Sequence, residues 1–147
     1  MFRIMFALHM LFAIFAVGPL VHATMTAARG VRRGDGAATA YSARVARIYA
    51  YVSVLAVIFG FGLMSSKQGG QTVAKFSETW IWLSAVLWLA AVGLTLAVIV
   101  PGLDTATERI GKEESVAPLT ARIAAAGGLV AIIFAVIVFL MVYQPGA

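Results

Sequence analysis

Cysteine is absent from the 147 residues, so the chain has no disulfide, no thiolate metal site and no nucleophilic thiol. Histidine occurs only twice, and charged residues make up only 12% of the chain. No stretch alternates apolar and polar residues in the way that indicates a half-buried strand. These absences exclude disulfide-stapled and thiol-dependent classes and predict an all-α protein.

Apolar side chains make up 62% of the sequence, and the mean hydropathy is +0.97. A water-soluble domain of this size cannot bury so much apolar surface, so the composition predicts a protein of the lipid bilayer. The net charge of +5 comes from 11 Lys and Arg against 6 Asp and Glu. In a membrane protein such an excess reports orientation, and we expect no nucleic-acid partner.

Four apolar runs are long enough to cross a bilayer. The first has no formal charge and, at ~1.5 Å of rise per residue, extends over ~36 Å, whereas a hydrocarbon core measures ~30 Å. Pro101 is expected to end the third run, and Pro118 suits the first turn of the fourth. The predicted spans are 4–27, 46–64, 79–100 and 119–143, joined by loops 28–45, 65–78 and 101–118 in one transmembrane domain.

An internal echo predicts how these spans pair. Ala43-Arg44-Val45-Ala46 recurs 78 residues later as Ala121-Arg122-Ile123-Ala124, ahead of the second and fourth spans. Ala16-Val17-Gly18 in the first span likewise matches Ala91-Val92-Gly93 in the third. The pattern favours two tandem αα-hairpins, although Ala, Val and Gly are common enough in apolar helices to coincide by chance.

Gly18 and Pro19 predict a kink in the middle of the first span, because proline cannot donate a helical hydrogen bond. Transporter sites are bordered by matched pairs of such breaks. The position that follows Gly93 in the third span is Leu94, so the sequence predicts an unpaired packing kink.

Basic residues predict the orientation. The loops on one side hold eight Lys and Arg and the other side holds three, so the positive-inside rule places both termini outside the inner (plasma) membrane. The alternative is a cleaved signal peptide that ends at Val21-His22-Ala23. The length of the first apolar run, and its interruption by Gly18 and Pro19, argue against this alternative. Five arginines are candidates for contact with anionic lipid headgroups or an acidic subunit: Arg29, Arg32, Arg33, Arg44 and Arg47.

His9 and His22 are the candidate cofactor ligands, because ionisable side chains are rare inside a membrane. They are 13 residues apart, which is ~20 Å along a helix, so they cannot share one haem or metal. We expect structural hydrogen bonds instead, from His9 to Ser84 and from His22 to Tyr51. Binding of haem b or copper, and a proton relay, stay open as alternatives.

Small residues spaced four apart indicate close helix contacts, within the chain or with another protein. These pairs are Ala46 with Ala50, Ala56 with Gly60, Gly93 with Ala97, and Ala124 with Gly128. No nucleophile with a base, paired buried acids or phosphate-binding glycine loop is present, so we expect no enzymatic activity.

Leu8-His9, Ala16-Val17-Gly18 and the basic first loop together resemble an uncharacterised family of small four-helix bacterial membrane proteins. The alanine- and arginine-rich composition is similar to that of actinobacterial proteins. A weaker likeness to copper-resistance D type membrane domains implies metal handling through His9, although the further histidines and methionine-rich motifs expected for that role are missing.

Three functions follow as hypotheses. The first is a non-catalytic accessory subunit packed against other integral membrane subunits, for example in a lipid-transport or respiratory assembly. The second is a haem- or copper-binding membrane protein that uses His9 or His22. The third is a small oligomeric transporter or channel.

Overall fold

A computed structural model describes all 147 residues as four long helices, each long and apolar enough to cross a membrane. The chain is therefore an all-α, multi-pass membrane protein, as the composition predicts. The first helix joins α1 (Phe2–Phe12), the π-helical turn η1 (Ala13–Val17) and α2 (Gly18–Arg32), and the second is α3 (Gly36–Ser65). The third joins α4 (Thr79–Leu94), the π-helical turn η2 (Thr95–Ile99) and α5 (Val100–Gly111), and the fourth is α6 (Ala117–Tyr143).

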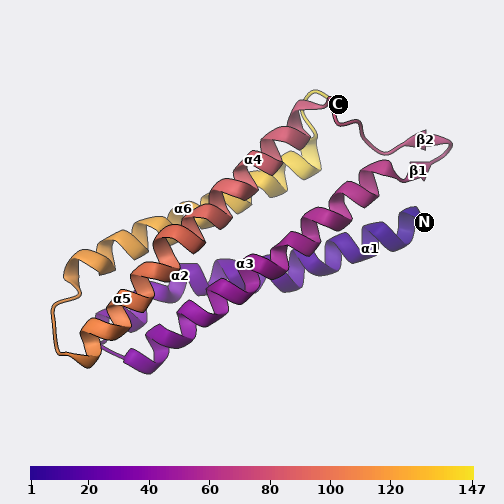
Figure 1. Cartoon of the computed structure of the whole chain (residues 1–147). Coiled ribbons are helices and arrows are strands. Elements are labelled where there is room, and N and C mark those ends of the chain that lie inside the picture. The colour runs from indigo at the N-terminus through magenta and orange to yellow at the C-terminus, as the bar shows by residue number, and fades with distance from the viewer.

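Both termini lie at one end of the bundle (Figure 1), which we call the terminal end. The turns at 33–35 and 112–116 lie at the opposite end, near which most of the arginines gather, and we call this the arginine end. Arg44 and Arg122, the charged residues of the sequence echo, both lie near the starts of helices that begin at the arginine end. Their neighbours pack differently, since Ala43 is buried and Ala121 is exposed.

The helices extend well beyond the predicted spans, so the predicted loops 28–45 and 101–118 are mostly helical. The reason lies in the inward face of α2, where buried residues recur at helical spacing past the end of the apolar run. That face comprises Leu20, Ala23, Thr24, Ala27, Ala28 and Val31. Asp35 then starts α3 by accepting a 3.0 Å hydrogen bond from the Ala38 backbone N–H.

The loop at the terminal end contains a short hairpin that the sequence pattern did not predict. Strand β1 (Lys67–Gln68) pairs antiparallel with β2 (Gln71–Thr72). Gly69 and Gly70 form the turn with φ of 62° and 87°, values that a residue with a Cβ rarely adopts. Each strand is too short to show an alternating pattern.

Pro101 does not end the third helix, so the predicted boundary at residue 100 is wrong. Proline instead occupies one of the first two positions of α5, directly after the π-helical turn η2. Pro19 has the same place at the start of α2, directly after η1. A π-helical turn widens the helix and shifts its hydrogen-bonding pattern, which accommodates a proline without ending the helix. The third helix therefore also has a break, at Pro101, seven positions beyond Leu94, the position that the repeat matches to Pro19.

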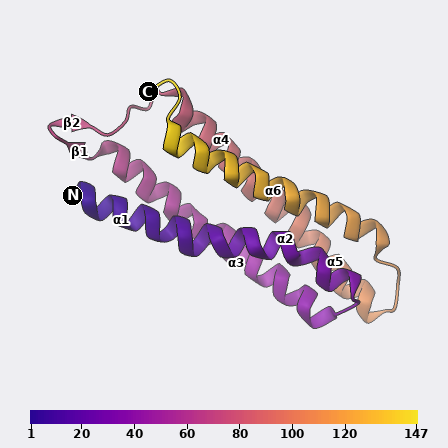
Figure 2. The ribbon, with the colours of Figure 1, turned by 180° about the vertical axis from the view of Figure 1, so that it is seen from behind.

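The two breaks divide the bundle into unlike halves. At the arginine end, α2 packs against α3, α5 and α6, and the largest buried cluster includes Leu20, Val31, Leu103 and Ile123. Toward the terminal end, α1 packs extensively only against α3, and α4 packs against α6 (Figures 1 and 2). α1 has no buried residue. The core of the protein thus lies in the arginine half, and the two hairpins separate beyond it.

The closest approach in that core is between α2 and α6. A Cβ placed on Gly127 would lie only 2.1 Å from the Thr24 carbonyl oxygen, so the two backbones touch here. A Cβ on the neighbouring Gly128 would meet nothing within 4 Å. Gly127, and not the predicted Gly128, is therefore the glycine that this helix crossing requires.

Candidate functional site

His9 is held against α3 by a notch of small residues. Its Nδ1 lies 2.7 Å from the Ala56 carbonyl oxygen, which requires the tautomer that carries the proton on Nδ1. A Cβ on Gly60 would come within 3.1 Å of the imidazole, so glycine at this position makes room for the ring. The predicted pair Ala56 and Gly60 thus packs within the chain, and His9 bonds to a backbone carbonyl, not to the predicted Ser84.

The same seam between α1 and α3 continues on both sides of His9. Phe12 stacks on Phe59 with ring centroids 5.3 Å apart, toward the middle of the membrane. Toward the terminal end, a Cβ on Gly62 would lie 3.1 Å from the Met5 sulfur. Side chains of α1 therefore fit against small or flat surfaces of α3 along the whole contact.

His22 does not share this environment. It is exposed on α2, and Tyr51 is also exposed, so the predicted bond between them is absent. No three His, Asp or Glu side chains gather into a group that could hold a metal ion. Neither histidine therefore belongs to a cluster of imidazole and carboxylate side chains.

Ser84 and Ser53 bring polar groups into the membrane interior at the junction of the two hairpins. Trp88 of α4 donates its indole N–H to Ser53 Oγ of α3 at 3.1 Å, and Ser53 donates to the Ala50 carbonyl at 2.6 Å. Ser84 lies one turn of α4 from Trp88, is 4% exposed, and its hydroxyl has no hydrogen-bond partner. A buried hydroxyl without a partner is unusual in native proteins.

The predicted arginine group divides into paired and unpaired members. Arg47 forms a 2.9 Å ion pair with Asp104 of α5, with both side chains about half exposed, so this arginine is engaged within the chain. No ion pair involves the other four predicted contact residues, namely Arg29, Arg32, Arg33 and Arg44. All four side chains are exposed, so their guanidinium groups are free to bind anions.

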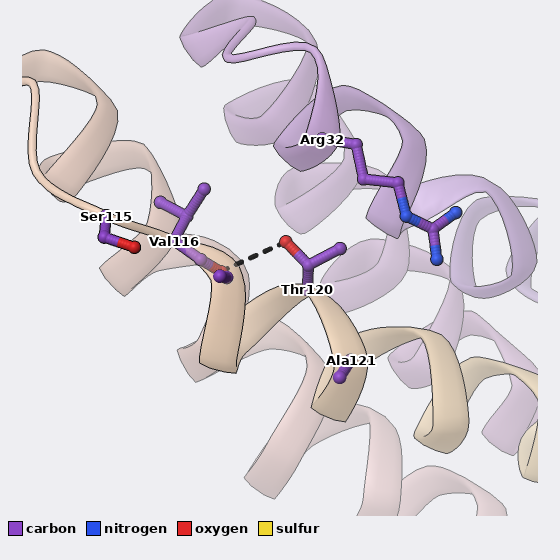
Figure 3. Close-up of a pocket in the computed structure, with 6 residues that line it drawn as sticks. Arg32, Ser115, Val116, Thr120 and Ala121 are labelled. Carbon is purple, nitrogen blue, oxygen red and sulfur yellow. Dashed lines mark hydrogen bonds between the residues drawn. The ribbon is translucent and has the colours of Figure 1, made fainter.

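An open hollow of about 500 Å³ lies beside Arg32, between α2 and the start of α6. In Figure 3 the Arg32 side chain extends from α2 beside the first turn of α6, where Thr120 donates its hydroxyl to the Val116 carbonyl at 3.1 Å. Ser115 and Ala121 complete the labelled lining. The hollow combines one free positive charge with small polar groups.

The remaining small-residue pairs differ in their use. Ala46 and Ala50 are fully buried, so this pair packs inside the bundle. Gly93 and Ala97 are exposed, and a Cβ on Gly93 would meet nothing within 4 Å. This second pair is therefore a small outward surface on the third helix, open to lipid or to another helix.

The sequence reasoning missed Gly127, the bond between Trp88 and Ser53, and the pair of Arg47 with Asp104. One signal was present, since Trp88 lies well inside the third span, away from the interface where tryptophan usually lies, and its N–H needs a partner there. Nothing in the sequence distinguishes Gly127 from Gly128, because only the rotation of α6 decides which glycine faces α2.

Comparison with protein-family models, with curated proteins and with solved structures finds no match to this chain.

Proposed function

We propose that this protein is a non-catalytic accessory subunit that packs against other integral membrane subunits, for example in a lipid-transport or respiratory assembly. The observation that carries the proposal is the incomplete packing of the terminal half. α1 has one extensive helix neighbour and no buried residue, although a subunit embedded in an assembly gains further neighbours from other chains.

The outward pair Gly93 and Ala97 supports the same proposal. Small side chains let the backbone of a second helix approach closely, and van der Waals packing of this kind drives helix association in lipid. Large apolar side chains are exposed on the same helix, including Leu89 and Val86. This face of the third helix is the one that we assign to a partner helix.

The charged groups support an orientation within the proposal. We place the chain in a plasma membrane with both termini outside and the arginine end in the cytoplasm, where Arg29, Arg32, Arg33 and Arg44 contact anionic headgroups. Each such residue near the surface contributes roughly 1 kcal/mol of attraction. A C-terminal fusion to a reporter enzyme that works only outside the cytoplasm should be active, and a fusion to a reporter that works only in the cytoplasm should be inactive. The reverse result would contradict this orientation.

Gentle affinity purification in mild detergent with mass spectrometry tests the proposal. We expect specific integral membrane proteins to co-elute with the wild-type chain and to be lost with Gly93→Leu, because a Cβ at this position points into open space and the leucine side chain would block the outward surface. Ala135→Leu, on an exposed position of α6, is the matched control and should retain the partners. A lone monomer from the wild type would refute the proposal.

The paired breaks favour a second candidate, a small oligomeric transporter or channel. Paired discontinuous helices are typical of secondary transporters. η1 with Pro19 and η2 with Pro101 give the first helix of each hairpin such a break, although the two breaks are not at matched positions of the repeat. Flux of candidate ions or metabolites into proteoliposomes tests this reading, and the absence of flux under any gradient would favour the accessory role.

A further inference from the structure

We infer that the two π-helical turns with their prolines act as paired hinges, on which the terminal halves of the two hairpins move apart and together, with a latch between Trp88 and Ser53. The hinges and the latch are features of this chain alone. The inference therefore holds for either proposed function and does not depend on a partner.

The first argument concerns stiffness. Proline gives no backbone N–H, and a π-helical turn breaks the regular hydrogen-bonding pattern, so the helix is locally less constrained. Both features coincide at η1 with Pro19 and at η2 with Pro101, and both turns lie against α3. Each hairpin therefore has one weak point, partway along its first helix.

The second argument concerns how the helices pack on the two sides of these breaks. Toward the arginine end, α2, α3, α5 and α6 share one buried core, which resists relative movement. Toward the terminal end, α1 rests on α3 and α4 rests on α6, and the two pairs diverge (Figure 2). Besides the Trp88 to Ser53 bond, the two pairs share there a small buried cluster of Met64, Ala74, Trp80 and Ile81. The terminal half thus consists of two units joined by far less buried surface than the base.

The third argument is that the unbroken helices permit the motion. α4 is 16 residues long and extends ~24 Å from its hinge, so a rotation of about 10° moves its tip by about 4 Å. The same rotation spread over about 20 Å of α3 or α6 needs a radius of curvature near 115 Å, gentler than the 60–100 Å that continuous helices commonly show. Only the first helix of each hairpin needs a break.

The fourth argument identifies the latch. Two side-chain hydrogen bonds join the hairpins: Arg47 to Asp104 in the fixed base, and Trp88 to Ser53 beyond the hinges. The second bond must break when the terminal halves separate. Ser84, one turn away on α4, has no hydrogen-bond partner that would add to this contact. Closure therefore gains a single side-chain hydrogen bond, whose net contribution is only about 1 kcal/mol.

Distances between spin labels test the inference, and the absence of native cysteine makes labelling specific. Ser65→Cys with Tyr143→Cys reports the terminal ends of the two hairpins, and Arg33→Cys with Glu114→Cys reports the arginine end. In liposomes, we expect a broad or two-component distance distribution for the first pair and a single narrow one for the second. A terminal pair as narrow as the arginine-end pair would overturn the inference.

Two sets of variants should shift the terminal distance in opposite directions. Pro19→Ala with Pro101→Ala supplies the missing donors and should narrow the distribution, while Trp88→Phe removes the latch donor and should enlarge the longer component. Ser53→Ala removes the same bond from the other side and serves if Trp88→Phe does not fold. A terminal distribution that none of these variants changes would also overturn the inference, and the arginine-end distance should stay constant throughout.

Discussion

Replacement of Gly127 by alanine should separate the two halves of the core at its closest point. The added Cβ would lie 2.1 Å from the Thr24 carbonyl oxygen and 2.9 Å from its carbon, both of which are backbone atoms that no rotamer can move. An ordinary carbon contact needs about 3.5 Å, so α2 and α6 must separate by more than ~1 Å. The hydrogen of the Gly127 Cα faces this carbonyl, and its weak attraction would be lost as well.

We expect Gly127→Ala to destabilise the protein by about 2–4 kcal/mol, since overpacking at a rigid contact costs about 1–3 kcal/mol and the helices then lose contacts on both sides. The assay is unfolding by increasing mole fraction of a denaturing detergent, followed by circular dichroism or tryptophan fluorescence. Gly128→Ala is the matched control, because its Cβ meets nothing within 4 Å and alanine favours a helix over glycine by up to about 1 kcal/mol.

The two positions are adjacent, but only the Cβ at 127 meets another helix. Gly127→Ala should therefore lower the free energy of unfolding, and Gly128→Ala should raise it. If Gly127→Ala unfolds at the same detergent fraction as Gly128→Ala, the close approach of α2 to α6 does not exist and the rotation of α6 is different. A loss of stability in both variants would instead indicate that Gly128 faces another helix.

Three further predictions concern the hairpin contacts. Gly60→Ala should cost roughly 1 kcal/mol in the same unfolding assay, because its Cβ would press on the His9 ring at 3.1 Å; unchanged stability would show that the ring moves freely. Ser84→Ala should leave stability unchanged or raise it by up to about 1 kcal/mol, since it removes a buried hydroxyl without a partner, and a clear loss would reveal a partner. Arg47→Gln and Asp104→Asn in a double-mutant cycle should show a coupling energy below about 1 kcal/mol that falls as salt rises, because both side chains are half exposed; a coupling above about 2 kcal/mol would contradict this.

The four spans and the end at which the arginines gather could be predicted from the sequence, because apolar length and charge are properties of local segments. The continuation of α2 through the basic stretch was also readable in principle, since Ala27, Ala28 and Val31 keep the helical spacing of the buried face. The first apolar run ends earlier than its helix, and the buried core continues past that run through Ala28 and Val31.

Other features depend on three-dimensional context. Proline in a sequence signals a helix end, and only the π-helical turn before Pro101 lets the third helix continue. His9 has many possible acceptors, and the choice of the Ala56 carbonyl follows from how α1 lies on α3. The use of Gly127 depends in the same way on the setting of one helix against another.

The contact between Gly127 and Thr24 also dictates an order of events during synthesis. α1 needs only α3, so the first hairpin can acquire these contacts while the ribosome is still translating the remainder. α2 acquires its Gly127 contact only when α6, the last segment made, reaches it. Until translation ends, the side of α2 that faces α6 therefore stays uncovered by protein, although its other side already packs against α3.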